Sequence, residues 1–276
     1  MRSVILPDTT PVPALGQGTW RMGEDQRLRN LETAALRAGI DLGMTLIDTA
    51  EMYGDGATET FLGEALAGLR DQVLLVSKVY PQNAGRGRIE RACEASLQRL
   101  RTDHLDLYLL HWRGSVPLGE TVEGMEALIR AGKIRRWGVS NLDHGDMEQL
   151  VRAGGDACAT DQILYNVTER GAEFDLLPQL RQRKIPAMAY SPIGQGRLPA
   201  SPALAAVAHR HEVTPYQVAL AWVLRDPAVI AIPKASDVAH VTENRRALDL
   251  KLTEEDLTAI DAEFAPPTRK TRLAML

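Results

Sequence analysis

The chain has 276 residues, of which 45% are hydrophobic and 25% charged, and its formal net charge is -4. This composition is typical of a globular protein, and the charge provides no basic surface of the kind that binds nucleic acid. No apolar stretch approaches the ~18 residues needed to span a bilayer, and the opening MRSVILPDTT lacks the apolar run of a signal peptide. Two cysteines are too few for a disulfide framework. We therefore expect a cytoplasmic protein that binds neither nucleic acid nor membrane.

Eight short apolar runs recur along the chain, each followed by an amphipathic helical stretch. They are continuous rather than alternating, which is typical of parallel strands buried on both faces. The predicted strands are ALGQGTW (14–20), TLIDTA (45–50), VLLVSK (73–78), LDLYLLH (105–111), RWGVSN (136–141), ACATDQ (157–162), PAMAYSP (186–192) and AVIAIP (228–233). A hairpin is expected before them, roughly from SVIL (3–6) to VPAL (12–15).

The segments between these runs carry helical patterns and helix start signals. The buried face of the first helix is predicted to consist of Leu28, Leu31, Ala35, Ala38 and Leu42. A second apolar stripe consists of Phe61, Leu62, Ala65, Leu66 and Leu69. Three later helices are predicted to start at Thr214 with Pro215, at Ser236 with Asp237, and at Thr253.

Eight strand and helix units in a chain of this length predict a (β/α)8 TIM barrel, an α/β fold, whose lower end the N-terminal hairpin would close. We expect residues 1–276 to form a single domain. The alternative is a doubly wound nucleotide-binding sheet, which needs a third glycine after Gly16-Gln17-Gly18, where the chain has Arg21. The barrel is therefore favoured.

Ionisable residues gather at the predicted strand ends, where barrels of this kind carry their active sites. Asp48, Lys78 and His111 end three successive strands, and Tyr53 follows in a loop. Each alone could be structural, as a helix cap, a snorkelling lysine or a satisfied core residue. Together they suggest proton transfer, because a nearby ammonium lowers the pKa of a tyrosine from about 10. Asp48 could hold that ammonium, and a neutral histidine could orient a carbonyl.

The chain resembles the aldo-keto reductase family over essentially its whole length, and within it the bacterial members of the methylglyoxal reductase type. The matching segments are GQGTW, LIDTAEMYGDG, LLVSKVYP, LDLYLLHW, IRRWGVSN, DQILYN, AYSPIGQG and IPKASDVAHVTEN. The resemblance implies reduction of small aldehydes and ketones, methylglyoxal among them, to alcohols. It makes Asp48, Tyr53, Lys78 and His111 a catalytic tetrad, with Tyr53 as proton donor and the nicotinamide C4 of NADPH as hydride source.

The resemblance also implies how the cofactor, NADPH or NADP+, is held. Ser140, Asn141 and Gln162 would bind the nicotinamide carboxamide, and Tyr190 would stack on the ring. The other expected contacts are Gly18, Thr19, Trp20, Asp48, Ser191, Pro192, Ile193, Gly194, Gln195, Gly196, Ile232, Pro233, Lys234, Ala235, Ser236, His240, Glu243 and Asn244.

Lys234 precedes a predicted helix N-terminus, which suits a 2'-phosphate. His240 stands where many members of the family have arginine, and Ser236 lies one position later than the usual hydroxyl. Since histidine is only partly charged near neutral pH, NADPH is favoured over NADH less firmly than in those members.

Aromatic residues close to the strand ends are expected to wall the substrate pocket. Trp20, Tyr80 and Trp112 would join Tyr53 and His111 there, unless they only seal the rim of the barrel. No metal site is expected. The C-terminal segment PPTRKTRLAML (266–276) either folds over the site or trails along the surface.

The sequence is also compatible with two other functions. A lysine at a strand end, such as Lys78, could form an imine in a Schiff-base aldolase. A nicotinamide-nucleotide-sensing protein with little turnover would need the binding residues alone. For the assembly, we expect a monomer or a weak homo-oligomer.

Overall fold

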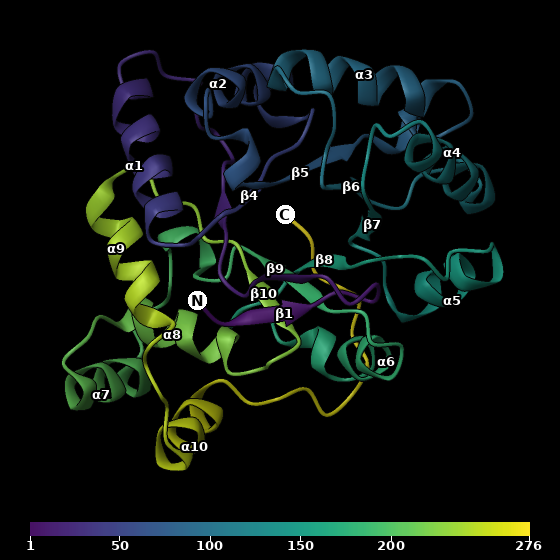
Figure 1. The fold of residues 1–276 in the computed structure, drawn as a ribbon. Coiled ribbons are helices and arrows are strands. Elements are labelled where there is room, and N and C mark those ends of the chain that lie inside the picture. Colours follow the sequence, from purple (N-terminus) through teal and green to yellow (C-terminus); the bar gives the residue numbers. More distant parts are fainter.

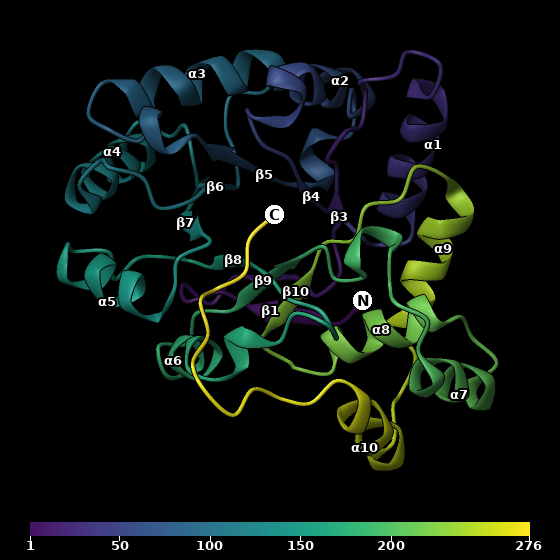
Figure 2. The same ribbon diagram turned by 180° about the vertical axis from the view of Figure 1, so that it is seen from behind.

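Eight parallel strands, neighbours in chain order, form the centre of the computed structural model, which describes residues 1–276 (Figure 1, and from behind in Figure 2). They are β3 (Gln17–Gly18), β4 (Leu46–Asp48), β5 (Leu74–Val79), β6 (Leu107–Leu110), β7 (Trp137–Ser140), β8 (Asp161–Leu164), β9 (Ala187–Tyr190) and β10 (Val229–Ala231). Backbone hydrogen bonds close the ring between its first and last strands. The Gly16 N–H donates to the Ala231 carbonyl at 2.9 Å, and the Gly18 N–H to the Pro233 carbonyl at 3.0 Å. The predicted (β/α)8 barrel is therefore confirmed.

Helices surround these strands in a ring (Figure 1). They are α1 (Arg29–Asp41), α2 (Ala57–Ala65), α3 (Arg88–Leu100), α4 (Leu118–Arg130), α5 (His144–Arg152), α6 (Leu176–Gln182), α7 (Pro202–His211), α8 (Pro215–Leu224), α9 (Val238–Ala247) and α10 (Glu254–Glu263). Helix α7 packs on α8, and α10 packs on α7. Helices α7 and α10 therefore form an outer layer. None of the helices combines the length and the apolar sequence that crossing a membrane requires.

The predicted helix starts agree with the structure. Thr214 and Thr253 form capping boxes at the first turns of α8 and α10. At the start of α9 the cap is Asp237, whose carboxylate accepts the His240 N–H. Each cap satisfies backbone donors that the first helical turn leaves free.

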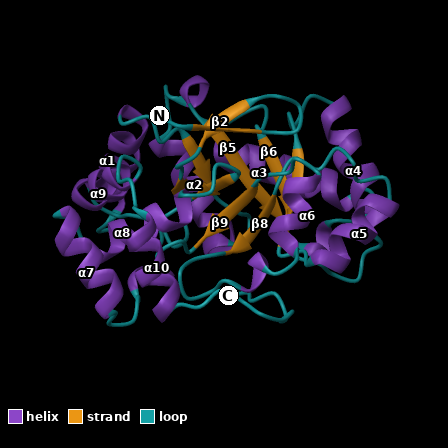
Figure 3. Ribbon diagram, turned by 90° about the horizontal axis from the view of Figure 1, so that it is seen from below, coloured by secondary structure: helices purple, strands orange, loops and turns teal.

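A small antiparallel hairpin precedes the barrel, as predicted. It pairs β1 (Ser3–Ile5) with β2 (Pro11–Pro13) and sets Val4 opposite Val12, both of them buried. Figure 3 shows the N-terminus and β2 at one end of the barrel and the C-terminus at the other. The hairpin therefore leaves the second end free for a site.

Most of the observed strands are shorter than predicted, and two differ most in their bounds. Strand β3 has two residues instead of the seven predicted, and β8 begins at Asp161 rather than at residue 157. The segment before β8 was mistaken for the strand because Cys158, Ala159 and Thr160 are as fully buried as the strand itself. An apolar run predicts which residues are buried, but it does not show at which residue the β-strand begins.

The predicted buried face of α1 was wrong in part. Leu28, Leu31 and Leu42 are exposed, and the face that meets the barrel is made of Glu32, Ala35, Leu36, Gly39 and Ile40. A buried carboxylate belongs to this face because Glu32 accepts the Gly23 N–H at 2.8 Å. Apolar periodicity cannot detect a helix face that includes a hydrogen-bonded glutamate.

Two glycines let the first strand fit between its neighbours. A Cβ on Gly18 would lie 2.7 Å from the Ile232 carbonyl oxygen, and one on Gly16 would lie 2.7 Å from that of Leu46. Any larger residue at these positions would push β3 away from both β4 and β10. The closure of the barrel therefore depends on the glycines of the GQG segment.

Candidate active site

A cavity of about 610 Å³ opens at the C-terminal ends of the strands. Its size is within the usual range for a ligand pocket. The predicted site residues that line it are Gly18, Thr19, Trp20, Asp48, Tyr53, His111, Trp112, Ser140, Asn141, Gln162, Tyr190, Ser191, Pro192, Ile193, Gln195, Gly196, Ile232, Pro233 and Lys234. Residues from all parts of the sequence thus meet in one place.

The ammonium of Lys78 connects three parts of the site. Lys78 is fully buried on β5, and its Nζ donates to Asp48 Oδ2 at 2.8 Å, to the Thr49 carbonyl at 2.7 Å and to the Tyr53 hydroxyl at 3.0 Å. The second carboxylate oxygen of Asp48 accepts the side-chain amide of Gln162 at 2.7 Å. Because the Tyr53 oxygen accepts from Lys78, its own O–H is left to donate elsewhere.

Charge and burial oppose each other in this group. Burial would lower the pKa of Lys78, but Asp48 and Tyr53 outweigh it and raise the pKa, so the lysine is charged. An imine requires a neutral amine, so this geometry argues against a Schiff-base aldolase. For Tyr53, burial raises the pKa and the charge of Lys78 offsets only part of the rise. Our expectation of a lowered tyrosine pKa was therefore wrong, because desolvation of a phenolate exceeds the attraction of one ammonium.

His111 follows the last residue of β6 and is neutral. Burial, aided by the charge of Lys78, lowers the pKa of His111 to about 2. Its ring lies edge-on to that of Tyr53, with 6.1 Å between centroids. Nδ1 is buried without a hydrogen-bond partner, so the ring proton is better placed on Nε2, the nitrogen that can meet a substrate.

The residues predicted to bind the carboxamide form one hydrogen-bonded group. Ser140 ends β7 and donates to the Gln162 carbonyl at 2.8 Å, while the Asn141 amide donates to the His111 carbonyl at 3.1 Å. The Tyr190 hydroxyl donates to Asn141 Oδ1 at 2.9 Å. Gln162 is the second residue of β8, not its end as expected, and it reaches Asp48 because its side chain points into the barrel.

The lining also suits the phosphates of a dinucleotide. Lys234 follows β10, and Arg197 lies in the loop between β9 and α7 and forms no ion pair within the chain. Asp48, the one acidic side chain in the lining, is neutralised by Lys78. With Arg21, three cationic side chains line the cavity. Together with the amide-binding group, they fit a nicotinamide dinucleotide.

The aromatic residues near the strand ends do not all line the cavity. Trp20 and Trp112 do, whereas Tyr80 stands behind Trp112 with 5.8 Å between ring centroids. The Trp112 ring in turn lies 4.8 Å from that of His111. Tyr80 thus supports a wall of the cavity instead of forming its surface.

Some predicted cofactor residues lie outside the lining of the cavity. They are Gly194, Ala235, Ser236, His240, Glu243 and Asn244. His240 is exposed on α9 and its Nδ1 lies 2.7 Å from Asp237. The cofactor roles of these residues stay predictions.

Sequence reasoning missed five lining residues: Arg21, Met52, Arg197, Met275 and Leu276. Met52 and Arg197 adjoin predicted site residues, so a wider window around those motifs would have included them. The last two could not be found, because their place depends on the course of the tail. The Leu276 N–H lies 3.3 Å from the Tyr190 hydroxyl, so the segment folds over the site, one of the two courses left open.

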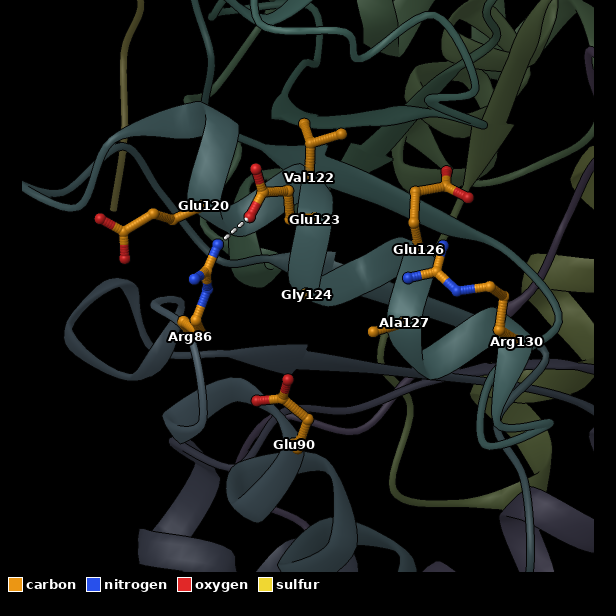
Figure 4. A pocket seen from close by; sticks show the side chains of 9 residues that line it. All are labelled: Arg86, Glu90, Glu120, Val122, Glu123, Gly124, Glu126, Ala127 and Arg130. Carbon is orange, nitrogen blue, oxygen red and sulfur yellow. Dashed lines mark hydrogen bonds and ion pairs between the residues drawn. The ribbon is translucent and has the colours of Figure 1, made fainter.

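A second hollow of about 500 Å³ lies on the side of the barrel between α3 and α4 (Figure 4). Four glutamates and two arginines line it, and Arg86 pairs with Glu123 at 2.6 Å. It shares no residue with the cavity at the strand ends. No group of three or more histidine, cysteine, aspartate or glutamate side chains in the chain is arranged to hold a metal ion. We therefore place the candidate active site at the strand ends.

Comparison with known proteins agrees with this fold. The profile of the Aldo/keto reductase family matches residues 14–263, and the chain belongs to this family. The resemblance seen in the sequence is thereby confirmed.

Particular relatives are similar over almost their full length. Methylglyoxal reductase YeaE of Escherichia coli is 55% identical over 271 residues, which cover 96% of this chain and 95% of that protein. Glyoxal reductase of Bacillus subtilis is 31% identical, with 94% and 92% covered. Among solved structures, an aldo-keto reductase from Klebsiella pneumoniae in complex with NADPH has a TM-score of 0.96 and 54% identity, covering 100% of this chain and 99% of that one.

Proposed function

We propose that this chain reduces small aldehydes and ketones of the methylglyoxal type to alcohols with NADPH. The observation that carries this proposal is the position of Tyr53, whose oxygen accepts a hydrogen bond from the charged Lys78 at 3.0 Å while its proton remains available. NADPH, when bound, supplies a hydride from its nicotinamide C4 to the carbonyl carbon. The E. coli relative named for methylglyoxal and the K. pneumoniae structure with NADPH support both choices.

The side chains of the tetrad supply the proton and the charge. His111, being neutral, donates a hydrogen bond that orients the substrate carbonyl oxygen. As negative charge develops on that oxygen, Tyr53 transfers its hydroxyl proton to it. The ammonium of Lys78 stabilises the tyrosinate that remains, and Asp48 holds the ammonium in place.

We assign the remaining lining residues to the cofactor. Ser140, Asn141 and Gln162 would hold the carboxamide, Tyr190 the nicotinamide ring, and Lys234 a phosphate. The off-cavity residues named above would complete the adenosine end. Because Lys234 and Arg197 both line the cavity, NADPH is favoured over NADH.

The wider setting follows from the same proposal. We infer that residues 1–276 act as one domain, as a monomer or weak homo-oligomer that binds a small carbonyl compound and no nucleic acid. Cys93 and Cys158 are free and buried, which suits a reducing cytoplasm.

The proposal is tested by following the nicotinamide absorbance of NADPH in the presence of methylglyoxal. We expect wild-type turnover and a loss of about 10² to 10⁴ in kcat for Tyr53→Phe, with NADPH binding retained. Equal rates for both proteins would contradict the proposal. Tight NADPH binding without turnover over a panel of aldehydes would instead favour a sensing protein.

A further inference from the structure

A buried glutamate, Glu51, connects the loop that follows β4 to the loop that follows β5. Glu51 lies between Asp48, which ends β4, and Tyr53, and the residue is buried, with 9% of its surface exposed. Its own N–H donates to the carbonyl of Lys78 at 3.4 Å. Glu51 therefore lies in the loop that carries Tyr53, and its backbone is hydrogen-bonded to Lys78 on β5.

The carboxylate of Glu51 binds the chain just beyond Lys78. Its Oε1 accepts the Tyr80 N–H at 2.6 Å and the Asn83 side-chain amide at 3.2 Å. Tyr80 is the first residue after β5, where no further strand pairing supplies an acceptor for its N–H. A carboxylate is a stronger acceptor than a backbone carbonyl, so this bond fixes the start of the loop firmly.

The loop held by Glu51 supports the wall of the cavity. The Tyr80 ring packs edge-on against Trp112, and Trp112 packs against His111. A shift of Tyr80 would thus move Trp112, which lines the cavity beside the residue that orients the substrate. Tyr53, two residues from Glu51, lines the same cavity, and its ring lies edge-on to that of His111.

We propose that Glu51 is a positioning residue that sets the distance between the proton donor Tyr53 and the substrate wall formed by Trp112, through its hydrogen bond to the Tyr80 N–H. Glu51 is not among the residues that line the cavity. This inference rests on the proposed carbonyl reduction, and it assigns Glu51 to substrate fit rather than to proton transfer. Loss of the carboxylate therefore affects KM for the aldehyde more than kcat.

The test compares Glu51→Ala, Glu51→Gln and wild type with methylglyoxal and NADPH. In Glu51→Ala we expect KM for methylglyoxal to rise about tenfold, the effect of roughly one charge-assisted hydrogen bond, with kcat within about threefold and NADPH affinity unchanged. Glu51→Gln keeps an acceptor oxygen and should restore most of KM. Asn83→Ala removes only the longer bond and should have a small effect.

A double variant separates positioning from general loosening. If Glu51 acts through Tyr80, then Glu51→Ala added to Tyr80→Ala should raise KM no further, because coupled residues are not additive. Full additivity, or a fall in kcat at unchanged KM, would overturn the proposal.

Hydrogen exchange at the Tyr80 amide gives a readout that does not need activity. We expect fast exchange in Glu51→Ala and protection in Glu51→Gln. Absence of turnover in wild type would refute the proposed function, whereas active wild type with an unchanged KM in Glu51→Ala would refute the role of Glu51 alone.

Discussion

The Nζ of Lys78 and Oδ2 of Asp48 lie 2.8 Å apart, with exposed side-chain fractions of 0% and 3%. Because both side chains are buried, each charge is compensated by the other and not by water. Removal of one member therefore leaves an uncompensated buried charge. The pair therefore matters to folding as well as to chemistry.

Lys78→Met should lower the free energy of unfolding by about 3–5 kcal/mol, because Asp48 then stays buried without its cation. The double variant Asp48→Asn with Lys78→Met should recover much of this stability without recovering reductase activity. Urea denaturation followed by tryptophan fluorescence measures both effects. A single variant as stable as wild type would show that the pair is not structurally important.

The reductase rate should not depend on histidine ionisation near neutral pH. The pKa of His111 is lowered to about 2, so His111 stays neutral at all higher pH values. The pKa of Tyr53 is raised above its ordinary value of about 10, so its proton is present below that pH. We expect kcat/KM for methylglyoxal to be flat from about pH 5 to pH 9. A step centred near pH 6.5, the ordinary pKa of histidine, would contradict this view.

Lys234→Met should discriminate between the two nicotinamide cofactors. Lys234 lines the cavity and its Nζ contacts the Ser236 hydroxyl. Loss of one charged contact to a phosphate should raise KM for NADPH about tenfold or more, with little change for NADH. Lys251→Met, an exposed lysine beyond α9, is the matched control. An equal rise for both cofactors would place Lys234 away from the 2'-phosphate.

Asp256 should make the outer helices sensitive to acid. Burial acts to raise the pKa of Asp256, but hydrogen bonds from Thr253, His211 and Arg210 outweigh it and hold the pKa well below its usual range. A depressed folded-state pKa contributes stability above the unfolded value of about 3.9, and this contribution is lost as pH falls.

We therefore expect Asp256→Asn to be destabilised relative to wild type at pH 7, with the difference shrinking as pH falls below about 4. Urea unfolding at several pH values measures this. Asp249→Asn, which removes an exposed pair with Arg245, should cost less than about 1 kcal/mol. A pH-independent difference for Asp256→Asn would mean that packing, and not ionisation, causes the loss.

The barrel and the tetrad could be predicted because their signals are local. Asp48 ends β4 and His111 follows β6, whereas Lys78, predicted to end its strand, is followed by one more buried strand residue, Val79. Parallel strands bring all three positions to one end of a barrel. Strand order brings Asp48, Lys78 and His111 together, and the resemblance to the aldo-keto reductase family adds Tyr53 and the catalytic roles.

Other features depend on contacts that no local pattern records. Glu32 is buried on α1, where it accepts the N–H of Gly23 from the preceding turn, and Glu51 accepts the N–H of Tyr80, which stands behind Trp112. The direction of the Tyr53 pKa shift depends on the balance between burial and nearby charge. The sequence identifies the charged residues, but it does not show how deeply the hydroxyl is buried. The tail over the cavity is a further case, since residues 266–276 have no periodicity.

The bonds that join Gly16 and Gly18 to the end of β10 connect strands from opposite ends of the barrel sequence. During synthesis, the backbone edge of β3 that pairs with β10 therefore stays unpaired until β10 has left the ribosome. Contacts so distant along the chain make folding slow, and an open strand edge in the meantime invites pairing with other chains. Glycine at these two positions therefore also favours folding. A bulkier residue would hinder the pairing of β3 with β10 and so lengthen the time for which the edge of β3 is unpaired.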